Sequence, residues 1–302
     1  MTLTRVLTAL VLMPAVIAIV LFTPTWAVAI ATALITVLAL REYFALGDAI
    51  GHRPYRLWTV FCSLLLIVQQ WIATSPNDSW FAPGGWFAGD IGHSHVNLVL
   101  ALILPDFPLM LFVLGLTTLT LFTRRPLVES LPSAGISASA LLLVAFPLSY
   151  AIRLQGFKPL LLVAPRPDGP RLLLFALTIT WAADTVAYFA GRAFGKHPLA
   201  PHISPKKTWE GSLAGMLGSL LVAYAFHFWL TIPIAHLLAM AVLGNIAGQM
   251  GDLLESACKR SAGVKDSGGL LPGHGGVLDR IDALILCIPV IWYYLVLVNP
   301  HL

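Results

Sequence analysis

The stretch from Gly251 to Asp282 reads GDLLESACKRSAGVKDSGGLLPGHGGVLDRID and is flanked by two apolar runs, Ile234–Met250 and Ile281–Val298. It holds nine charged residues and His274, although only 11% of the whole chain is charged. Apolar runs of this length are long enough to cross a hydrocarbon core of ~30 Å. The charged stretch is therefore expected at the mouth of a membrane domain. Its carboxylates, paired bases and glycines suit a phosphate-bearing, metal-dependent ligand.

Similar apolar runs recur along the chain. The 302 residues are 58% hydrophobic and have a mean hydropathy of +0.84, which excludes an ordinary soluble domain. The expected fold class is an all-α polytopic integral membrane protein. About nine spans are predicted: Arg5–Phe22, Trp26–Leu40, Leu57–Ala73, Asn97–Phe122, Ile136–Ile152, Leu172–Ala190, Ser212–Trp229, Ile234–Met250 and Ile281–Val298. The first is interpreted as a retained span and not a signal peptide, because it is long and another run follows at once.

The distribution of basic residues predicts the orientation. If the N-terminus is cytoplasmic and the loops alternate, 14 of the 18 bases fall on the cytoplasmic side: Arg5, Arg41, Arg53, Arg56, Arg124, Arg125, Arg192, Lys196, Lys206, Lys207, Lys259, Arg260, Lys265 and Arg280. This bias satisfies the positive-inside rule and favours an odd number of spans with the C-terminus outside. Because basic residues also bind phosphates, part of the bias is functional.

The two halves of the chain differ in polarity. Residues 1–154 read as a hydrophobic transmembrane scaffold, and residues 155–302 as the half that carries the chemistry, within one membrane domain. In the first half, the aromatic and basic stretch Arg41–Arg56 predicts an interfacial helix. His93 and His95 lie in a glycine-rich outer loop and are interpreted as solvated side chains, not as metal ligands.

Asp184 is the most informative residue of the sixth span. Thr180, Asp184 and Tyr188 follow an i, i+4, i+8 spacing and share one helix face. An intramembrane carboxylate costs at least ~2.5 kcal/mol unless it is solvated or paired, which makes it a functional candidate by default. The alternative is a structural ion pair with a base on another helix.

The next loop, Gly191–Gly211, reads GRAFGKHPLAPHISPKKTWEG. It is not a P-loop: its glycines are too close together, His197 follows the lysine where Ser or Thr is needed, and no strand precedes it. Its end holds adjacent lysines, two hydroxyls and a glutamate. These residues indicate anion binding: Ser204, Lys206, Lys207, Thr208 and Glu210.

The eighth span continues into the polar stretch with a stripe of side chains on one face. Asn245, Gln249, Asp252, Ser256 and Lys259 fall within a narrow arc, which predicts a water-filled cavity beside them. Asp279 and Asp282 then open the ninth span with Arg280 between them. Small residues at Gly211 and Gly215, and at Gly244 and Gly248, are interpreted as close helix contacts.

These motifs carry a resemblance to a known family. The matching residues are Ser256, Lys259-Arg260, Lys265-Asp266, Gly268, Leu271-Pro272, His274-Gly275-Gly276 and Asp279-Arg280-Ile281-Asp282. Over these 27 positions, every spacing resembles the signature of phosphatidate cytidylyltransferases, also called CDP-diacylglycerol synthases. Cys258 departs from it, standing where a larger aliphatic residue is usual. Asp184, Ala187-Tyr188, Gly191-Arg192 and Ser204–Gly211 also resemble upstream motifs of this family, whereas the first half matches only in hydropathy.

The resemblance implies a multi-pass enzyme of a bacterial inner membrane. It would make CDP-diacylglycerol and pyrophosphate from CTP and phosphatidate on its cytoplasmic side. By this likeness Asp252 and Asp279 hold Mg²⁺, with a second cation left open. Asp184, Asp266 and Asp282 would support them, and the surrounding bases would be Lys206, Lys207, Lys259, Arg260 and Lys265. The remaining residues expected to bind substrate are Ser204, Thr208, Glu210, Ser256, His274, Gly275, Gly276 and Arg280.

Two alternatives remain at this stage. One is cytidylyl transfer to another lipid phosphate, which only the acyl-chain groove distinguishes. The other is an ion-coupled transporter with Asp184 as a relay residue, which would spread charges across the membrane thickness. No nucleic-acid partner is expected, and a homodimer is left open.

Overall fold

The computed structural model describes residues 2–74, 106–123, 126–157, 168–269 and 275–298. The first half is built from α1 (Thr2–Phe22), α2 (Thr25–Ala49), α3 (Arg56–Thr74), α5 (Phe107–Phe122), η1 (Leu127–Glu129), α6 (Ser130–Ala140), the π-helical turn η2 (Leu141–Ala145) and α7 (Phe146–Gln155). The second half contains α8 (Gly169–Phe194), β1 (Pro198–Ala200), β2 (Ser204–Thr208), α9 (Trp209–His227), α10 (Ile234–Ser261) and α11 (Leu278–Val298).

The helical architecture fits an all-α membrane protein. In the described part of the chain, six helical segments are long and apolar enough to cross a membrane: α2, α3, the continuous segment Leu127–Gln155, α8, α10 and α11. The three remaining predicted spans overlap α1, α5 and α9. The count of nine and the side of the N-terminus stay predictions.

One expectation about local structure was wrong. Arg41–Arg56 is not a separate interfacial helix: α2 continues through Ala49, the chain turns, and α3 begins at Arg56. Because no proline follows Leu40 before that turn, nothing ends α2 at the predicted boundary. One short antiparallel hairpin accompanies the helices: β1 and β2 pair Pro198 with Thr208 and Ala200 with Ser204.

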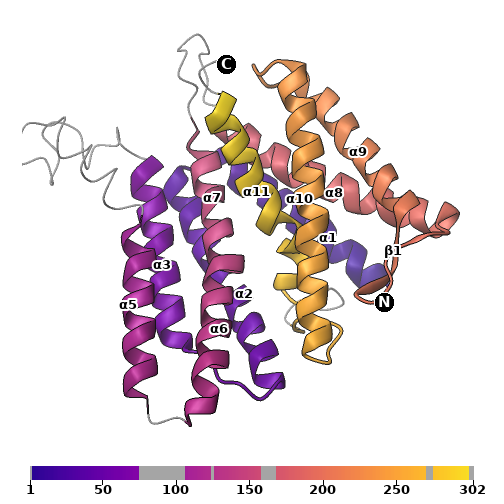
Figure 1. Cartoon of the computed structure of the whole chain (residues 1–302). Helices are drawn as coiled ribbons and strands as arrows, with labels where there is room; N and C mark the ends of the chain where they lie inside the picture. The colour runs from indigo at the N-terminus through magenta and orange to yellow at the C-terminus, as the bar shows by residue number, and fades with distance from the viewer. Residues whose placement is uncertain (1, 75–105, 124–125, 158–167, 270–274, 299–302) are drawn as a thin grey trace, which may run out of the picture.

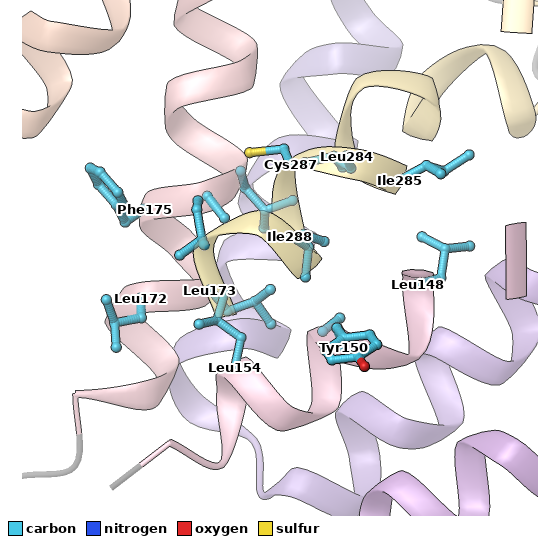
Figure 2. Close-up of a cluster of buried hydrophobic side chains, with 14 of the residues drawn as sticks. Leu148, Tyr150, Leu154, Leu172, Leu173, Phe175, Leu284, Ile285, Cys287 and Ile288 are labelled. Atoms are coloured by element: carbon cyan, nitrogen blue, oxygen red, sulfur yellow. The ribbon is translucent and has the colours of Figure 1, made fainter. Parts of the chain in front are cut away.

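Helices of the two halves pack against one another (Figure 1), and the largest apolar cluster of the described residues includes side chains of both halves. Figure 2 shows its centre, where α7 contributes Leu148 and Leu154, α8 contributes Leu172 and Phe175, and α11 contributes Ile288. All five side chains are buried. The polar helix ends of the second half are therefore held on a scaffold that the first half helps to build.

The glycine pairs lie at close helix contacts, as the spacing predicted. A Cβ atom on Gly211 or Gly215 of α9 would come within 2.8 and 2.9 Å of the Ala187 and Ala183 carbonyl oxygens of α8. On α10, a Cβ at Gly244 would lie 3.1 Å from Cys287 Sγ, and one at Gly248 3.4 Å from the Ala283 oxygen of α11. These contacts bring α8, α9, α10 and α11 close together around the polar residues.

Candidate active site

A cavity of about 660 Å³ opens between α8, α9, α10 and the hairpin. This volume lies within the range of small-molecule sites, about 300–1,000 Å³. Bases, carboxylates and hydroxyls of three helices and one strand converge on it. Its lining residues are Ala183, Asp184, Ala187, Tyr188, Gly191, Arg192, Leu199, Lys206, Lys207, Thr208, Gly211, Ser212, Gly215, Gln249 and Asp252.

The hairpin explains how the adjacent lysines reach the cavity. Strand β2 ends at Thr208, whose hydroxyl caps α9 by accepting a hydrogen bond from the Gly211 backbone N–H at 3.2 Å. The strand therefore runs directly into the helix, and both Lys206 and Lys207 line the cavity. Gly191 lets α8 approach this cap, because a Cβ there would lie 3.0 Å from Thr208 Oγ1.

The cavity pairs a base with a carboxylate at its centre. Lys207 of β2 forms an ion pair with Asp252 of α10, and about a quarter of each side chain is exposed. Asp184 of α8 and Asp282 of α11 both lie within electrostatic range of Asp252. Three carboxylates from three helices thus concentrate negative charge beside a lysine, an arrangement that attracts cations.

A second charged group lies between α10 and α11 and is much less accessible. Lys259 pairs with Glu255 one turn earlier on α10 and donates to Asp279 Oδ1 of α11 at 2.6 Å. The three side chains are only 5–11% exposed. We call Glu255, Lys259 and Asp279 the buried network. Burial of charges at this depth requires such pairing, because an unpaired ion would lose its hydration without compensation.

Asp279 is also held by the backbone of the loop that precedes α11. Its Oδ2 atom accepts hydrogen bonds from the N–H groups of Gly276 at 2.7 Å and Ser267 at 3.1 Å. Gly275 adopts a φ of +77°, a conformation that glycine takes without the strain of other residues, and a Cβ there would lie 2.6 Å from Asp279 Oδ2. The paired glycines of the motif therefore let the backbone close around this carboxylate.

Comparisons with known proteins show which family this chain is similar to. A family profile described as Cytidylyltransferase family matches residues 3–298. The phosphatidate cytidylyltransferase of Synechocystis sp. is 35% identical over 283 residues, covering 92% of this chain and 91% of that protein. The phosphatidate cytidylyltransferase of Haemophilus influenzae is 34% identical over 300 residues, or 96% and 97% of the two chains. A shorter match to the Bacillus subtilis protein of the same name is 43% identical over 131 residues.

The chain belongs to the cytidylyltransferase family. The resemblance of its motifs to that family is therefore confirmed over nearly the whole chain and not only over its second half.

Some of the residues predicted for a cytidylyltransferase site come together in the cavity, and others do not. Asp184, Lys206, Lys207, Thr208 and Asp252 line it. Arg280 at the start of α11 is exposed and lies within electrostatic range of Asp184. Lys259, Asp279, Gly275 and Gly276 belong to the buried network and its backbone support. Asp282 lies between the two groups, on the turn of α11 that follows Asp279.

Other predicted residues have structural contacts outside the cavity. Arg260 donates to the carbonyl oxygens of Ile203 at 3.3 Å and Val264 at 3.2 Å, which ties the end of α10 to the hairpin turn. Ser256 is buried on α10, Ser204 is half-buried on β2, and Lys265 and Asp266 are exposed. His274 lies outside the described residues, as do His93 and His95.

Glu210 contacts the hairpin and is absent from the cavity lining. Its Oε1 atom lies 2.6 Å from His197 Nδ1, and Oε2 accepts from the His197 N–H at 3.3 Å. A hydrogen bond from its own backbone N–H, together with the smaller effect of the bond to the His197 ring, lowers the pKa of this half-buried carboxyl to about 2. Glu210 therefore stays ionised and holds the hairpin against the first turn of α9.

The polar stripe of α10 faces a cavity only in part. Gln249 and Asp252 line it, but Asn245 is 2% exposed and donates to Ser219 Oγ of α9 at 2.9 Å. Ser219 in turn donates to the Ile179 carbonyl of α8 at 3.1 Å. Helix packing satisfies Asn245, so the expectation of water beside it was wrong at this position.

Sequence reasoning missed two carboxylates. Glu255 is part of the buried network, and its spacing of four residues from Lys259 could have indicated the pair. Glu42 of α2 contacts the loop before α11, 225 residues or more away in sequence. No local pattern links Glu42 to that loop.

Proposed function

We propose that this protein transfers the cytidylyl group of CTP to phosphatidate, giving CDP-diacylglycerol and pyrophosphate. The observation that carries the proposal is the cavity in which Lys206, Lys207 and Arg192 face Asp184 and Asp252, in a chain of the cytidylyltransferase family. Polyanionic substrates need such bases, and a cation-dependent reaction needs such carboxylates.

The reaction requires the two substrates to be aligned, whereas the attacking phosphate oxygen needs no activation by a base. A phosphate monoester has a second pKa of about 6, so most of the phosphatidate headgroup is already a dianion at neutral pH. One of its oxygens forms a bond to the α-phosphorus of CTP while the bond from that phosphorus to the bridging oxygen breaks. The electron pair leaves on pyrophosphate. No general base is needed, and the protein's task is to hold two polyanions in line.

The residues of the cavity suit that task. Lys206 is exposed and can contact a phosphate directly, whereas Lys207 is held in position by Asp252. The Thr208 oxygen accepts the cap hydrogen bond of α9, which fixes the strand's end, and its O–H group can still donate to a phosphate. Tyr188 and Arg192 lie one turn apart on α8, and both line the cavity.

The donor chemistry of the carboxylates fits Mg²⁺. This ion takes hard oxygen ligands and is usually bound by one or two carboxylates together with substrate phosphates. The described residues contain no group of three or more metal-ligating side chains that could hold an ion alone, so the phosphates of the substrates would complete the coordination. Asp252 and Asp279 would hold the ion, exchanging Lys207 and Lys259 for it. When bound, Mg²⁺ would supply neutralisation of the charge that develops on pyrophosphate.

The reaction is best explained without a covalent enzyme intermediate. An activated serine or cysteine needs a base within hydrogen-bond reach. Among the described residues, the hydroxyl of Ser204 and the thiol of Cys258 lie outside the cavity lining, and Ser212 donates to Gln249. Direct attack therefore requires that both substrates occupy the site together.

One assay tests the function. Purified protein in detergent micelles with Mg²⁺ is expected to release pyrophosphate only when CTP and phosphatidate are both present, and chelation should abolish the release. Omission of each substrate in turn supplies the controls. Exchange of labelled pyrophosphate into CTP without lipid would contradict direct attack, and no release with both substrates would contradict the function itself.

We also propose that the cavity faces the cytoplasm of a bacterial cell, with nine spans and a cytoplasmic N-terminus. The excess of bases in the loops of that side supports the orientation. In a cysteine-free background, cysteines at the exposed positions His202 and Lys265 should be protected from an impermeant thiol reagent added to intact cells. A cysteine at Asp78 should react. Labelling of His202→Cys from outside would reverse the orientation.

A further inference from the structure

Glu42 connects the hydrophobic half of the chain to the loop that supports Asp279. It lies on α2, where its neighbours Leu40 and Phe44 are 0% and 2% exposed and anchor the helix in the core. One Glu42 oxygen accepts the Val277 N–H at 3.0 Å, and the other accepts the Leu278 N–H at 2.8 Å. The second oxygen also accepts from the Ser267 hydroxyl at 3.2 Å.

These contacts provide a helix cap from another helix. The first N–H groups of an α-helix have no partner within the helix, and a side-chain oxygen of a preceding residue usually accepts from them. The residues before Leu278 are Gly275, Gly276 and Val277, none of which has a side-chain oxygen. Glu42 supplies the oxygens, and its negative charge at the start of α11 is also favoured by the helix dipole.

The Glu42 side chain fills the space that a Cβ atom would need at two glycines of the signature, Gly268 and Gly276. A Cβ on Gly268 would lie 2.6, 2.8 and 3.0 Å from the Oε1, Cδ and Cγ atoms of Glu42, and these are its three nearest contacts. A Cβ on Gly276 would overlap Glu42 Oε2 and Ser267 Oγ. Neither glycine has a positive φ, so it is the space taken by Glu42 that excludes a side chain at these positions.

The backbone segments that Glu42 holds are the ones that hold Asp279. Ser267 donates its hydroxyl to Glu42 and its N–H to Asp279. Gly276 packs against Glu42 and donates its N–H to Asp279 Oδ2. A displacement of either segment would therefore move the donors that orient the Asp279 carboxylate.

We propose that Glu42 is a positioning residue for cytidylyl transfer. It holds two backbone segments before α11, Ser267–Gly268 and Gly276–Leu278, so that Asp279 is presented in one orientation. This inference rests on the proposed function and on the assignment of Asp279 to the cation. Groups that orient a metal-binding carboxylate affect metal affinity or activity by about 10- to 100-fold when they are removed. Glu42 acts through Ser267, Gly276 and Asp279 and does not itself contact substrate.

The first test measures the dependence of pyrophosphate release on Mg²⁺. Glu42→Gln keeps the size of the side chain but offers one oxygen and one N–H₂ group, so one of the α11 N–H groups then faces a donor. We expect kcat to fall about 10- to 100-fold and the Mg²⁺ concentration for half-maximal activity to rise by a similar factor. Loss of folded enzyme lowers the plateau without moving that midpoint, so an unchanged midpoint would overturn the proposal.

The matched control is Asp48→Asn, which removes a carboxylate from the same helix. Asp48 pairs with Arg56 at an exposed position, and no hydrogen bond or ion pair joins it to the described residues of the loop before α11. Exposed pairs contribute little to stability, so this variant should behave as the wild type in both kcat and the Mg²⁺ midpoint. An equal effect of Asp48→Asn would assign the change to the charge of α2 and contradict a positioning role.

The second test needs no activity. Gly268→Ala should lower the thermal unfolding midpoint of the otherwise wild-type protein, because its Cβ meets Glu42. In a Glu42→Ala background those atoms are gone, and the same substitution should have little further effect. Gly269→Ala is the control, since a Cβ at Gly269 would meet nothing within 4 Å. An equal effect of Gly268→Ala in both backgrounds would show that Glu42 does not occupy this space.

The two tests separate the inference from the proposed function. If the wild-type protein releases no pyrophosphate, the function fails, while the unfolding cycle still decides whether Glu42 holds the loop. If the wild type is active and Glu42→Gln keeps its kcat and Mg²⁺ midpoint, the function stands and the positioning role fails.

Discussion

The cavity and the buried network use the same residue types in opposite ways. In the cavity, the Lys207–Asp252 pair is about a quarter exposed, and the neighbouring Lys206 is exposed. In the buried network, Lys259, Glu255 and Asp279 are 11%, 5% and 11% exposed and each contacts another member. Charges near water can change partners at little cost, whereas a buried charge can lose its partner only when another charge of the same sign replaces that partner.

This difference indicates a division of roles along α10. Asp252 lies toward the cavity and Glu255 toward the network, only one turn further along the helix. The cavity side can release its internal ion pairs when substrate phosphates arrive. The network side keeps the loop before α11, and with it Asp279, in one arrangement.

Removal of either proposed metal-binding carboxylate should have the largest effect. Asp252→Asn and Asp279→Asn each keep the size of the side chain but remove a charge, and turnover should fall by at least about 10³-fold, which corresponds to roughly 4 kcal/mol of lost stabilisation. Pyrophosphate release at saturating Mg²⁺ measures this. Full activity in either variant would remove that residue from the metal site.

The same two substitutions should differ in their effect on the free energy of unfolding, because Asp279 lies in the buried network and Asp252 lines the cavity. Asp279→Asn breaks a buried pair, a change that costs about 3–5 kcal/mol. Asp252→Asn breaks a partly exposed pair worth about 0–1 kcal/mol and relieves repulsion from Asp184 and Asp282. Chemical denaturation of the purified variants should show a loss only for Asp279→Asn. Equal losses would mean that both residues are structural to the same degree.

The corresponding lysines give the next largest contrast. Lys259→Met leaves Glu255 and Asp279 buried without a base and should destabilise the protein by about 3–5 kcal/mol. Lys207→Met should change stability by no more than about 1 kcal/mol and should raise KM for CTP. Addition of Glu255→Gln to Lys259→Met should recover part of the stability, because one uncompensated charge is removed. Failure of that rescue would show that packing, and not charge, dominates the network.

Much of this comparison could be predicted from sequence, because the signals were local. The apolar runs located the helices, and the intramembrane Asp184 indicated a functional position. Lys206, Lys207, Thr208 and Asp252 were assigned to one site, and all four line the cavity. The spacing of Gly211 and Gly215 predicted a close helix contact that the geometry confirms. Apart from the joint assignment of the lysines and Asp252, which came from the resemblance to a family, each of these inferences depends on residues within a few turns of one another.

The ion-pair partners could not be predicted from the sequence, because they depend on contacts between elements that are far apart in the chain. Which carboxylate Lys207 or Lys259 pairs with depends on how α10 packs against β2 and α11, and several acidic residues were equally suitable by spacing. Glu42 belongs to an apolar helix whose predicted end, Leu40, excluded it from the site. The hairpin was missed because its strands are only three and five residues long and contain Pro198 and Pro205, residues that usually argue against a strand.

The smallest expected effect on activity comes from a substitution that tests which helix contact sets the width of the cavity. Gly215 of α9 lines the cavity, and a Cβ there would lie 2.9 Å from the Ala183 carbonyl oxygen and 3.2 Å from Ala187 Cβ. Gly215→Ala should therefore push α9 away from α8 and cost about 1–3 kcal/mol, as other overpacked contacts do. Lys207 lies just before α9 and Asp184 lies on α8, so this movement would separate the two side chains. KM for CTP should therefore rise a few-fold with a smaller change in kcat.

The matched control is Gly135→Ala in α6, where a Cβ meets nothing within 4 Å and the better helix propensity of alanine should stabilise the protein by about 0.5–1 kcal/mol. If Gly215→Ala is as stable as the wild type, the contact between α8 and α9 is not what sets the width of the cavity.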